Sequence, residues 1–450
     1  MIIVFRYIWA AVLSMLLGYC FNNVWNREHN PASGCNEPEG RFTFVMIRPT
    51  VLIYFLILYL GFLLYFQGVV EGIYHFFSFS FNLVLTFTLY FLLLMPFRGW
   101  FRRYLSKRAC AICWLLPTFI FINANVLLIA SLIPFYMLYI PKSVFRVVMI
   151  IWALGFLVIF GKMLLEHFLF TDKVKKNAYV IHEKAVTELF LELKEKIGYK
   201  RPVKLLASYA CQTPFSMGFS DQNRTVIIPV RKENDFANQA FYQGYSKDEL
   251  RMIFLHELHH LQRCDVDTRF FLSFLKAFAF FNPIILLAIK NASEDLELSC
   301  DEIVTKDLDE TGKKAYAALL LKEAGPQKGF TTCLSAKASV LKYRMTNVVK
   351  DRSLFKGTFV IAALMFILSM CFGMIGISTE KTDFKAITAS DNIKSSNLIY
   401  YFGDPYHSAY VESFDSEVLL EVLNEVELYR LSSGLVFFGK ESGDSLTIYT

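Results

Sequence analysis

The chain has 450 residues, of which 55% are hydrophobic and 16% aromatic, and 45 of them are phenylalanine. Its mean hydropathy of +0.40 argues against an ordinary soluble protein of this length. The formal net charge is only +6, so the placement of the basic residues is more informative than their excess.

Six stretches are apolar enough to cross a bilayer, which takes about 20 residues. They cover residues 2–21, 46–66, 75–97, 111–140, 145–170 and 357–377. The first contains Arg6, so a cleaved signal or an interfacial helix is an alternative to a span there. The pattern predicts a mainly α-helical, polytopic membrane protein.

The loop 98–108 contains five basic residues and no acidic one, and such loops usually face the cytoplasm. Counting the spans onward from this loop places residues 171–355 inside the cell and 379–450 outside it. The lysine-rich character of the first segment and the acidic character of the second agree with that orientation.

Both segments outside the membrane read as mixed α and β structure. Apolar residues at helical spacing predict a helix that ends near Gly198, and residues 203–206 and 225–230 read as strands. In the tail, the spacing predicts a helix over 413–431, followed by two strands in "GLVFFG" and "SLTIYT". We therefore expect a small extracellular α+β tail.

The stretch "YSKDELRMIFLHELHH" carries the chemistry. Ser246 and Glu249 form a capping box, which predicts a helix from there to about Arg263. His256 and His260 are four residues apart, so they project from one face of that helix and can converge on one ion. Glu257 lies beside them, where it can act as a general base, and H-E-x-x-H is the pattern of zinc metalloproteases.

An accidental match to this short motif is the alternative interpretation, and His259 reads as a surface or packing residue. A catalytic zinc site also needs a third protein ligand. The acidic helix predicted over 292–308 offers Glu297, and Asp301 on the same face can accept the N–H of a ligating histidine. The plainer interpretation is a solvated acidic helix, and we assign its remaining acids to that role.

The stretch 270–290 is long enough to span the bilayer but is interrupted at Asn282-Pro283. A full crossing would put Glu297 on the opposite side of the membrane from the histidines. We therefore predict a helical hairpin, which places the zinc close to the cytoplasmic membrane face.

The segments "FLHELHHLQRCD", "NASEDLELSCDEIV" and "LKYRMTNV" resemble the membrane-bound metallopeptidases of the BlaR/MecR type over roughly residues 75–355. The resemblance implies a zincin-like α+β domain in which His256, His260 and Glu297 bind Zn²⁺. It also implies that Glu257 is the base and that Asp265 and Asp301 support the ligands. A more distant likeness is to the prenyl-protein and HtpX-type proteases.

Two departures from the family stand out. Five spans rather than three precede the zinc domain, and the tail is too short for a large penicillin-binding sensor. We predict that the chain has five regions: an additional membrane hairpin (1–70), membrane spans (71–170), a cytoplasmic zinc metallopeptidase domain (171–355), a transmembrane helix (356–378) and a small extracellular domain (379–450).

We therefore expect a signal-transducing zinc endopeptidase that cleaves itself or a cytosolic, repressor-like regulator. The alternative is a catalytically silent receptor on the same scaffold. Expected partners are the lipid bilayer, a protein substrate and an extracellular ligand, with no direct contact to nucleic acid. A homodimer is left open.

Overall fold

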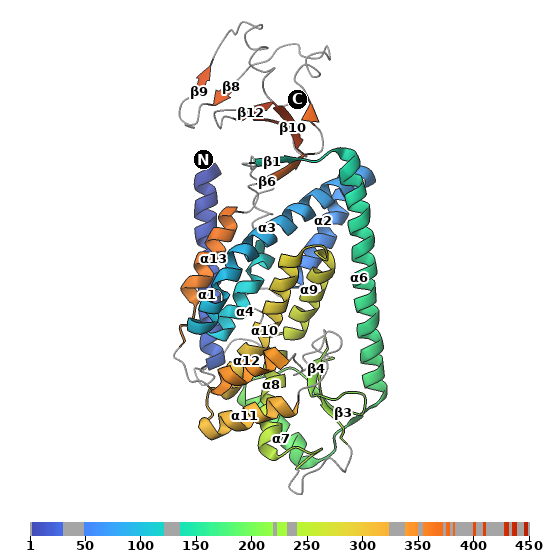
Figure 1. Ribbon diagram of the computed structural model, residues 1–450, viewed down its shortest axis with the longest axis vertical. Helices are drawn as coiled ribbons and strands as arrows, with labels where there is room; N and C mark the ends of the chain where they lie inside the picture. The colour runs from blue at the N-terminus through green and yellow to red at the C-terminus, as the bar shows by residue number, and fades with distance from the viewer. Residues whose placement is uncertain are drawn as a thin grey trace.

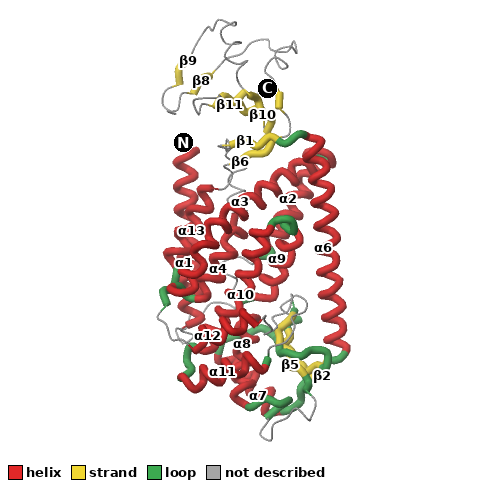
Figure 2. Tube along the Cα trace, viewed as in Figure 1, coloured by secondary structure: helices red, strands yellow, loops and turns green. Residues whose placement is uncertain are grey.

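The computed structural model describes most of the chain up to residue 371 and several strands of the tail. The described residues are 2–29, 49–120, 136–218, 223–231, 241–323, 338–349 and 354–371, together with the tail strands given below. Helices dominate, and strands gather at the two ends of the molecule (Figure 2).

Apolar helices form the long middle part of the molecule (Figure 1). They are α1 (Ile2–His29), α2 (Val51–Gln67), α3 (Val69–Tyr104), α6 (Lys142–Lys176) and α13 (Thr358–Cys371). Within the described residues, α1, α3 and α6 are long and apolar enough to cross a membrane, whereas α2 and α13 are shorter. A membrane protein follows from these helices, and the six predicted spans and their orientation stay predictions.

Two sequence predictions differ from this part of the structure. Residues 98–104 are not a loop, because α3 continues through Pro96 to Tyr104. The predicted span 111–140 begins instead with the short helix α4 (Lys107–Leu115) and the 3₁₀ turn Leu116–Phe119, all of whose side chains are buried. Residues 121–135 of that span lie outside the described residues, and near its end Tyr136–Tyr139 form the strand β1 instead of a helix.

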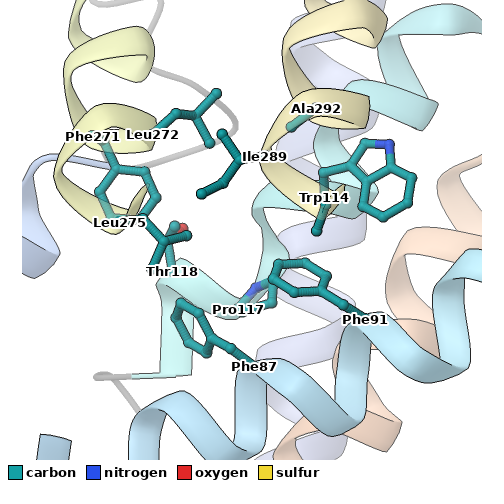
Figure 3. Close-up of a pocket in the computed structure, with 11 residues that line it drawn as sticks. Phe87, Phe91, Trp114, Pro117, Thr118, Phe271, Leu272, Leu275, Ile289 and Ala292 are labelled. Atoms are coloured by element: carbon teal, nitrogen blue, oxygen red, sulfur yellow. The ribbon is translucent and has the colours of Figure 1, made fainter. Parts of the chain in front are cut away.

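The helical hairpin expected over 270–290 is present as α9 (Asp265–Phe278) and α10 (Pro283–Thr305). Asn282 begins α10, because its side chain accepts from the N–H groups of Ile284 and Ile285. The hairpin packs against α3, α4 and α6 (Figure 1). A small apolar cavity lies between α3, α4 and the hairpin, lined by Phe91, Trp114 and Leu275 among others (Figure 3).

The mixed α and β part lies beyond one end of these helices (Figure 1). Its sheet has the order β2-β3-β5-β4, in which β3 and β5 are parallel and the outer pairs are antiparallel. The strands are β2 (Ala178–Val180), β3 (Lys204–Ser208), β4 (Phe215–Met217) and β5 (Thr225–Pro229). Gly218 ends β4 at φ +111, where an added Cβ would lie 2.3 Å from the Asn223 carbonyl oxygen. Glycine is therefore required at that turn.

Four helices complete this part: α7 (Lys184–Lys196), α8 (Lys247–Gln262), α11 (Glu310–Lys322) and α12 (Ala338–Val349). Apolar faces of these helices share one core with β3 and β5, around fully buried Leu250, Phe254 and Leu258 of α8. The fold therefore fixes α8 from one side by this core and from the other by the α9–α10 hairpin.

The tail contributes strands only, among the residues described. They are β6 (Ile375–Ser378), β7 (Lys381–Thr382), β8 (Ile399–Tyr401), β9 (Ser408–Tyr410), β10 (Glu427–Leu431), β11 (Gly434–Phe438) and β12 (Ser445–Ile448), and β6 pairs with β1 (Tyr136–Tyr139). The expected strands β11 and β12 are present. The predicted helix 413–431 is wrong over 427–431, because β10 pairs there with β11; its remaining residues, 413–426, lie outside the described part.

Candidate metal centre

The helix that carries the HExxH motif begins where the sequence predicts it. The Glu249 N–H donates to the Ser246 hydroxyl at 3.1 Å, and the Ser246 N–H donates to the Glu249 carboxylate at 2.7 Å. This capping box satisfies two backbone donors at the start of α8. Two turns further along, His256 and His260 point in one direction.

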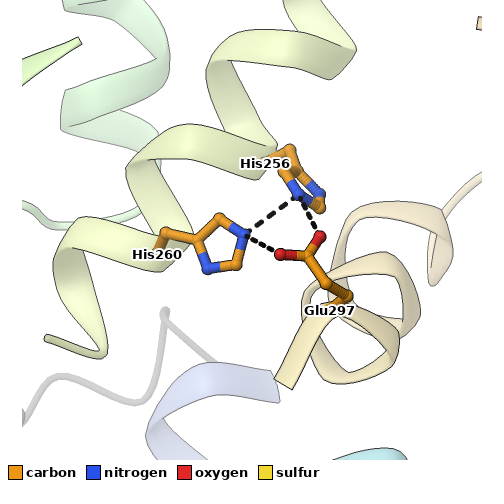
Figure 4. A group of neighbouring side chains, drawn as sticks. All are labelled: His256, His260 and Glu297. Atoms are coloured by element: carbon orange, nitrogen blue, oxygen red, sulfur yellow. Dashed lines mark hydrogen bonds and ion pairs between the residues drawn. The ribbon is translucent and has the colours of Figure 1, made fainter. Parts of the chain in front are cut away.

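Glu297 of α10 lies opposite the two histidines (Figure 4). The Nε2 atoms of His256 and His260 are 3.0 Å apart, and the Glu297 oxygens lie 3.5 Å from His256 Nε2 and 3.8 Å from His260 Nε2. Ligand atoms around one tetrahedral zinc ion are separated by about 3.3 Å, given bonds of about 2.0–2.1 Å. The histidine pair is close to that value, and each histidine faces a different Glu297 oxygen, Oε2 at His256 and Oε1 at His260. One ligand atom from each of the three residues lies within 4.8 Å of the other two, so the group can hold one metal ion.

Asp265 reaches His260 because the chain turns sharply after α8. Cys264 adopts a left-handed conformation at φ 58, which is uncommon for a residue with a side chain, and α9 starts at Asp265. The His260 Nδ1 lies 2.7 Å from Asp265 Oδ2. Donation of the Nδ1 hydrogen to this carboxylate leaves the Nε2 lone pair of His260 directed at the centre.

Tyr316 plays the corresponding part for His256, and it was not predicted. Its hydroxyl donates to Asp301 at 2.8 Å and lies 2.9 Å from His256 Nδ1. A hydroxyl has one hydrogen, so it must accept the Nδ1 hydrogen of His256. Asp301 itself is 3.6 Å from His256 Nδ1, and it therefore acts on His256 through Tyr316 rather than by a direct hydrogen bond.

Two arginines hold the Glu297 carboxylate. Arg344 of α12 lies 3.1 Å from Glu297 and donates two hydrogen bonds of 2.7 Å to Asp301. Arg269 of α9 forms a second ion pair with Glu297. Burial opposes ionisation of Glu297, but the guanidinium groups of Arg344 and Arg269 hold its pKa well below the usual range. Glu297 is therefore kept as a carboxylate, which is the form that binds a metal.

The centre is shielded from solvent. His256, Glu257 and His260 are 0% exposed, and Glu297 is 6% exposed. His259 is buried too, beside Gln262 at 3.1 Å. Burial, followed by the charge of Arg263, lowers the pKa of His259 to about 3. His259 is therefore a neutral packing residue, one of the two roles expected for it, and it is not at the surface.

A second group, formed by His260, Asp265 and Cys300, also lies close enough together to hold an ion. In this group the His260 Nδ1 is already hydrogen bonded to Asp265, and Arg263 donates to the Cys300 sulfur at 3.5 Å. An ion bound there would have to displace the hydrogen bond between His260 Nδ1 and Asp265. The geometry therefore favours the group of His256, His260 and Glu297 as the candidate metal site.

The acidic face of α10 is not solvated, contrary to the sequence interpretation. Asp295 is 1% exposed and accepts from Arg102 at 2.6 Å and from the Trp114 indole at 2.7 Å. Glu302 accepts the N–H of Lys107 at 3.0 Å, at the start of α4. These acids fasten the helix of the third candidate ligand to α3 and α4.

Apolar helices of membrane-spanning length and a buried cluster of two histidines and one glutamate are characteristic of a membrane-bound metallopeptidase. Residues 133–348 match the family model described as BlaR1 peptidase M56. The Regulatory protein BlaR1 of Bacillus licheniformis is 30% identical to the chain over 194 residues, which are 43% of this chain and 30% of that protein. Residues 133–348 therefore form a domain of the BlaR1-type peptidase M56 family, and a metallopeptidase family implies a metal ion.

Three residues of the centre were missed at the level of sequence: Tyr316, Arg269 and Arg344. Arg344 lies within the segment "LKYRMTNV" that resembles the family. The resemblance therefore marked its segment, but nothing in the sequence indicated that Arg344 would contact Glu297 and Asp301. The other two lie in ordinary helical patterns, and only the folded structure brings them to Glu297 and His256.

Proposed function

We propose that the protein is a zinc endopeptidase of signal transduction that resides in the membrane. In this proposal His256, His260 and Glu297 hold Zn²⁺, Glu257 is the general base, and Asp265 and Asp301 support the two histidines. One observation supports this proposal above all. The Nε2 atoms of His256 and His260 lie 3.0 Å apart, and the Glu297 carboxylate oxygens lie 3.5 Å and 3.8 Å from them, in a buried position.

When bound, Zn²⁺ supplies a Lewis acid that polarises the scissile carbonyl and makes an attacking water more acidic. The chain's own residues do the remainder. Glu257, beside His256 on α8, takes the proton from the water and passes it to the leaving amine nitrogen. Tyr316 and Asp265 keep the imidazoles in the tautomer whose Nε2 lone pairs face the ion.

The placement of the basic residues supports a cytoplasmic metal centre. The basic segment 98–108 ends beside α10: Arg102 pairs with Asp295, and the Lys107 N–H meets Glu302. The basic segment 98–108 and the helices of the candidate ligands therefore lie toward one end of the bundle, and the tail strands lie at the other (Figure 1). On this basis we propose that residues 171–355 face the cytoplasm and the tail, 379–450, faces outward.

The proposed substrate is a protein inside the cell, either this chain itself or a repressor-like regulator. The relative is named a regulatory protein, which supports a role in signalling for this chain. An extracellular ligand that acts on the tail or the membrane helices would supply the signal. The complete burial of the histidines and Glu257 fits an enzyme whose active site is closed at rest and becomes accessible when the signal arrives.

The same shielding is also what a catalytically silent receptor would show, so one experiment must separate the two functions. The full chain is purified in lipid nanodiscs as wild type, Glu257→Gln and the double variant His256→Ala/His260→Ala. Glu188→Gln, an exposed acid on α7, is the matched control. Bound zinc is measured by mass spectrometry, and cleavage by the appearance of new protein termini in cells.

The proposal expects about one zinc per chain in wild type, Glu257→Gln and Glu188→Gln, and little in the double histidine variant. Cleavage and signalling should be lost in Glu257→Gln and kept in Glu188→Gln. Signalling that survives in Glu257→Gln would instead favour the receptor. Equally low zinc in wild type and the double histidine variant would remove the metal centre from the account.

A further inference from the structure

The end of the first helix reaches the metal centre through a buried ion pair. Glu28, in the last turn of α1, accepts two hydrogen bonds from Arg263, at 2.8 Å and 3.1 Å. Both side chains are 1% exposed. Such a two-point contact fixes both the distance and the orientation of the guanidinium group.

Arg263 joins three helices that are far apart in the sequence. It is the residue directly after α8, the helix of His256 and His260. While two of its nitrogens hold Glu28, the third donates to the Ser299 hydroxyl at 3.0 Å and to the Cys300 sulfur at 3.5 Å. Ser299 and Cys300 belong to α10 and follow Glu297 within three positions, so the guanidinium bridges the two helices that supply the candidate ligands.

Glu28 also balances two buried cations. Arg108 of α4 lies 3.4 Å from the same carboxylate. Without Glu28, Arg108 and Arg263 would repel each other in a buried site in which Asp265 is the acid that still acts on both, and the loss of one partner of a buried ion pair is strongly unfavourable. Arg263 would then be driven away from Ser299 and Cys300, because its orientation toward α10 depends on the carboxylate behind it.

We propose that Glu28 is a positioning residue of the metal centre: it holds Arg263, and Arg263 fixes the end of α8 against α10, which sets the separation between the histidine pair and Glu297. This inference rests on the proposed function, because it assumes that these residues bind zinc. It also links α1, which lies in the N-terminal region 1–70 that was predicted only as an additional membrane hairpin, to the site through Arg263.

The packing of α1 against α13 connects the contact between Glu28 and Arg263 to the helix that leads to the tail. Gly18 of α1 lies against α13, where an added Cβ would be 3.5 Å from the Cβ of Ala362. The Lys356 ammonium, next to the start of α13, donates to Asn26 of α1 at 2.8 Å. A displacement of α13, which leads to the tail, would therefore move the helix that carries Glu28 (Figure 1).

The test measures zinc affinity of the full chain in nanodiscs, by competition with a chelator, for Glu28→Gln, Arg263→Gln and the double variant. Glu71→Gln, an exposed acid at the start of α3, is the matched control. Supporting groups around metal ligands typically change affinity by about 10–100-fold, and for Glu28 we expect about a tenfold rise in the zinc dissociation constant. The double variant should be no weaker than the weaker single variant, because both remove one link.

Absorption spectra of the Co²⁺-loaded proteins provide a second readout, since they follow the geometry around the ion and not the stability of the fold. The expected result is a changed Co²⁺ spectrum in Glu28→Gln and an unchanged one in Glu71→Gln. Wild-type zinc affinity and spectrum in Glu28→Gln would overturn the inference, and so would additive losses in the double variant.

If Glu28→Gln does not fold, Arg263→Lys replaces it. Lysine keeps the charge but cannot reach Glu28, Ser299 and Cys300 together, so a rise of about tenfold is again expected, and an unchanged affinity would overturn the inference. The wild-type measurement separates the two proposals. Absence of zinc from wild type contradicts the proposed function, whereas equal zinc affinity in wild type and Glu28→Gln contradicts only the role of Glu28.

Discussion

Arg344→Met is the substitution that tests the polar framework of the metal centre most severely. Arg344 is fully buried, donates two hydrogen bonds of 2.7 Å to Asp301 and lies 3.1 Å from Glu297. Methionine fills much of the same volume but carries no charge. The substitution therefore leaves two buried carboxylates that have lost their common partner.

The expected cost follows from those three contacts. At about 1.5–3 kcal/mol for each hydrogen bond to a charged group, their sum would be about 4.5–9 kcal/mol. The contacts share one guanidinium group and are not additive, so the cost of breaking one buried ion pair, about 3–5 kcal/mol, is the better value. We expect the free energy of unfolding to fall by that amount at neutral pH.

The stability difference between wild type and Arg344→Met should depend on pH, and its direction follows from the pKa of Glu297. In wild type, Arg344 and Arg269 overcome the cost of burial and lower the pKa of Glu297 well below 4.5, so its ionised form stabilises the fold above pH 4.5 and that stability is lost as the pH falls through the lower, folded-state pKa. In Arg344→Met the pKa of Glu297 should rise. Protonation then removes the energetic cost of a buried carboxylate that has lost Arg344 as its partner. The difference between wild type and variant should therefore shrink on acidification.

The assay is denaturant unfolding of the metal-free full chain in detergent, followed by tryptophan fluorescence at pH 7 and pH 4.5. Lys342→Met, an exposed cation on the same helix, is the matched control. Arg344→Met and Lys342→Met that unfold within about 1 kcal/mol of each other at pH 7 would refute the reasoning, since surface changes cost about that or less.

Three further substitutions test separate contacts. Tyr316→Phe removes the hydroxyl that accepts from His256, so zinc affinity should fall about tenfold or more in a chelator competition; an unchanged affinity would exclude that support. Asp295→Asn weakens the 2.6 Å ion pair with Arg102 and should cost about 3 kcal/mol in unfolding, and a cost near zero would contradict the buried docking of α10. Burial raises the pKa of Glu302 from 4.5 to about 7, so the folded state binds this proton more tightly and stability should fall by at most about 3 kcal/mol as the pH rises between those values. Glu302→Gln should remove that dependence, and a profile identical to wild type would disprove it.

Local signals were sufficient to predict the helix that carries the candidate histidines. The capping box at Ser246 and the spacing of His256 and His260 are properties of a single helix, and the structure has that helix. The helical hairpin followed from one further requirement, namely that Glu297 return to the same side as the histidines. The family resemblance is confirmed by the match over residues 133–348.

Properties that depend on distant partners could not be predicted in the same way. Asp295 and Glu302 looked like solvated acids, because nothing near them in the sequence indicates Arg102, Trp114 or the first turn of α4. The apolar spacing over residues 418–426 predicts a helix that continues to 431, but residues 427–431 form a strand, since pairing with residues 434–438 decides their conformation.

The same limit explains what was missed around the histidines. Tyr316 reaches His256 from 60 residues away, and Glu28 reaches Arg263 from 235 residues away. The first region of the chain was therefore predicted only as an additional membrane hairpin, although its first helix ends beside Arg263.

X-ray absorption at the zinc edge of the purified full chain tests the central claim most directly. The account predicts a first shell of nitrogen and oxygen atoms only, at about 2.0–2.2 Å, which is lost in His256→Ala/His260→Ala. A sulfur neighbour at about 2.3 Å would place the ion at Cys300 instead, and wild-type protein that retains no zinc would contradict the metal centre altogether.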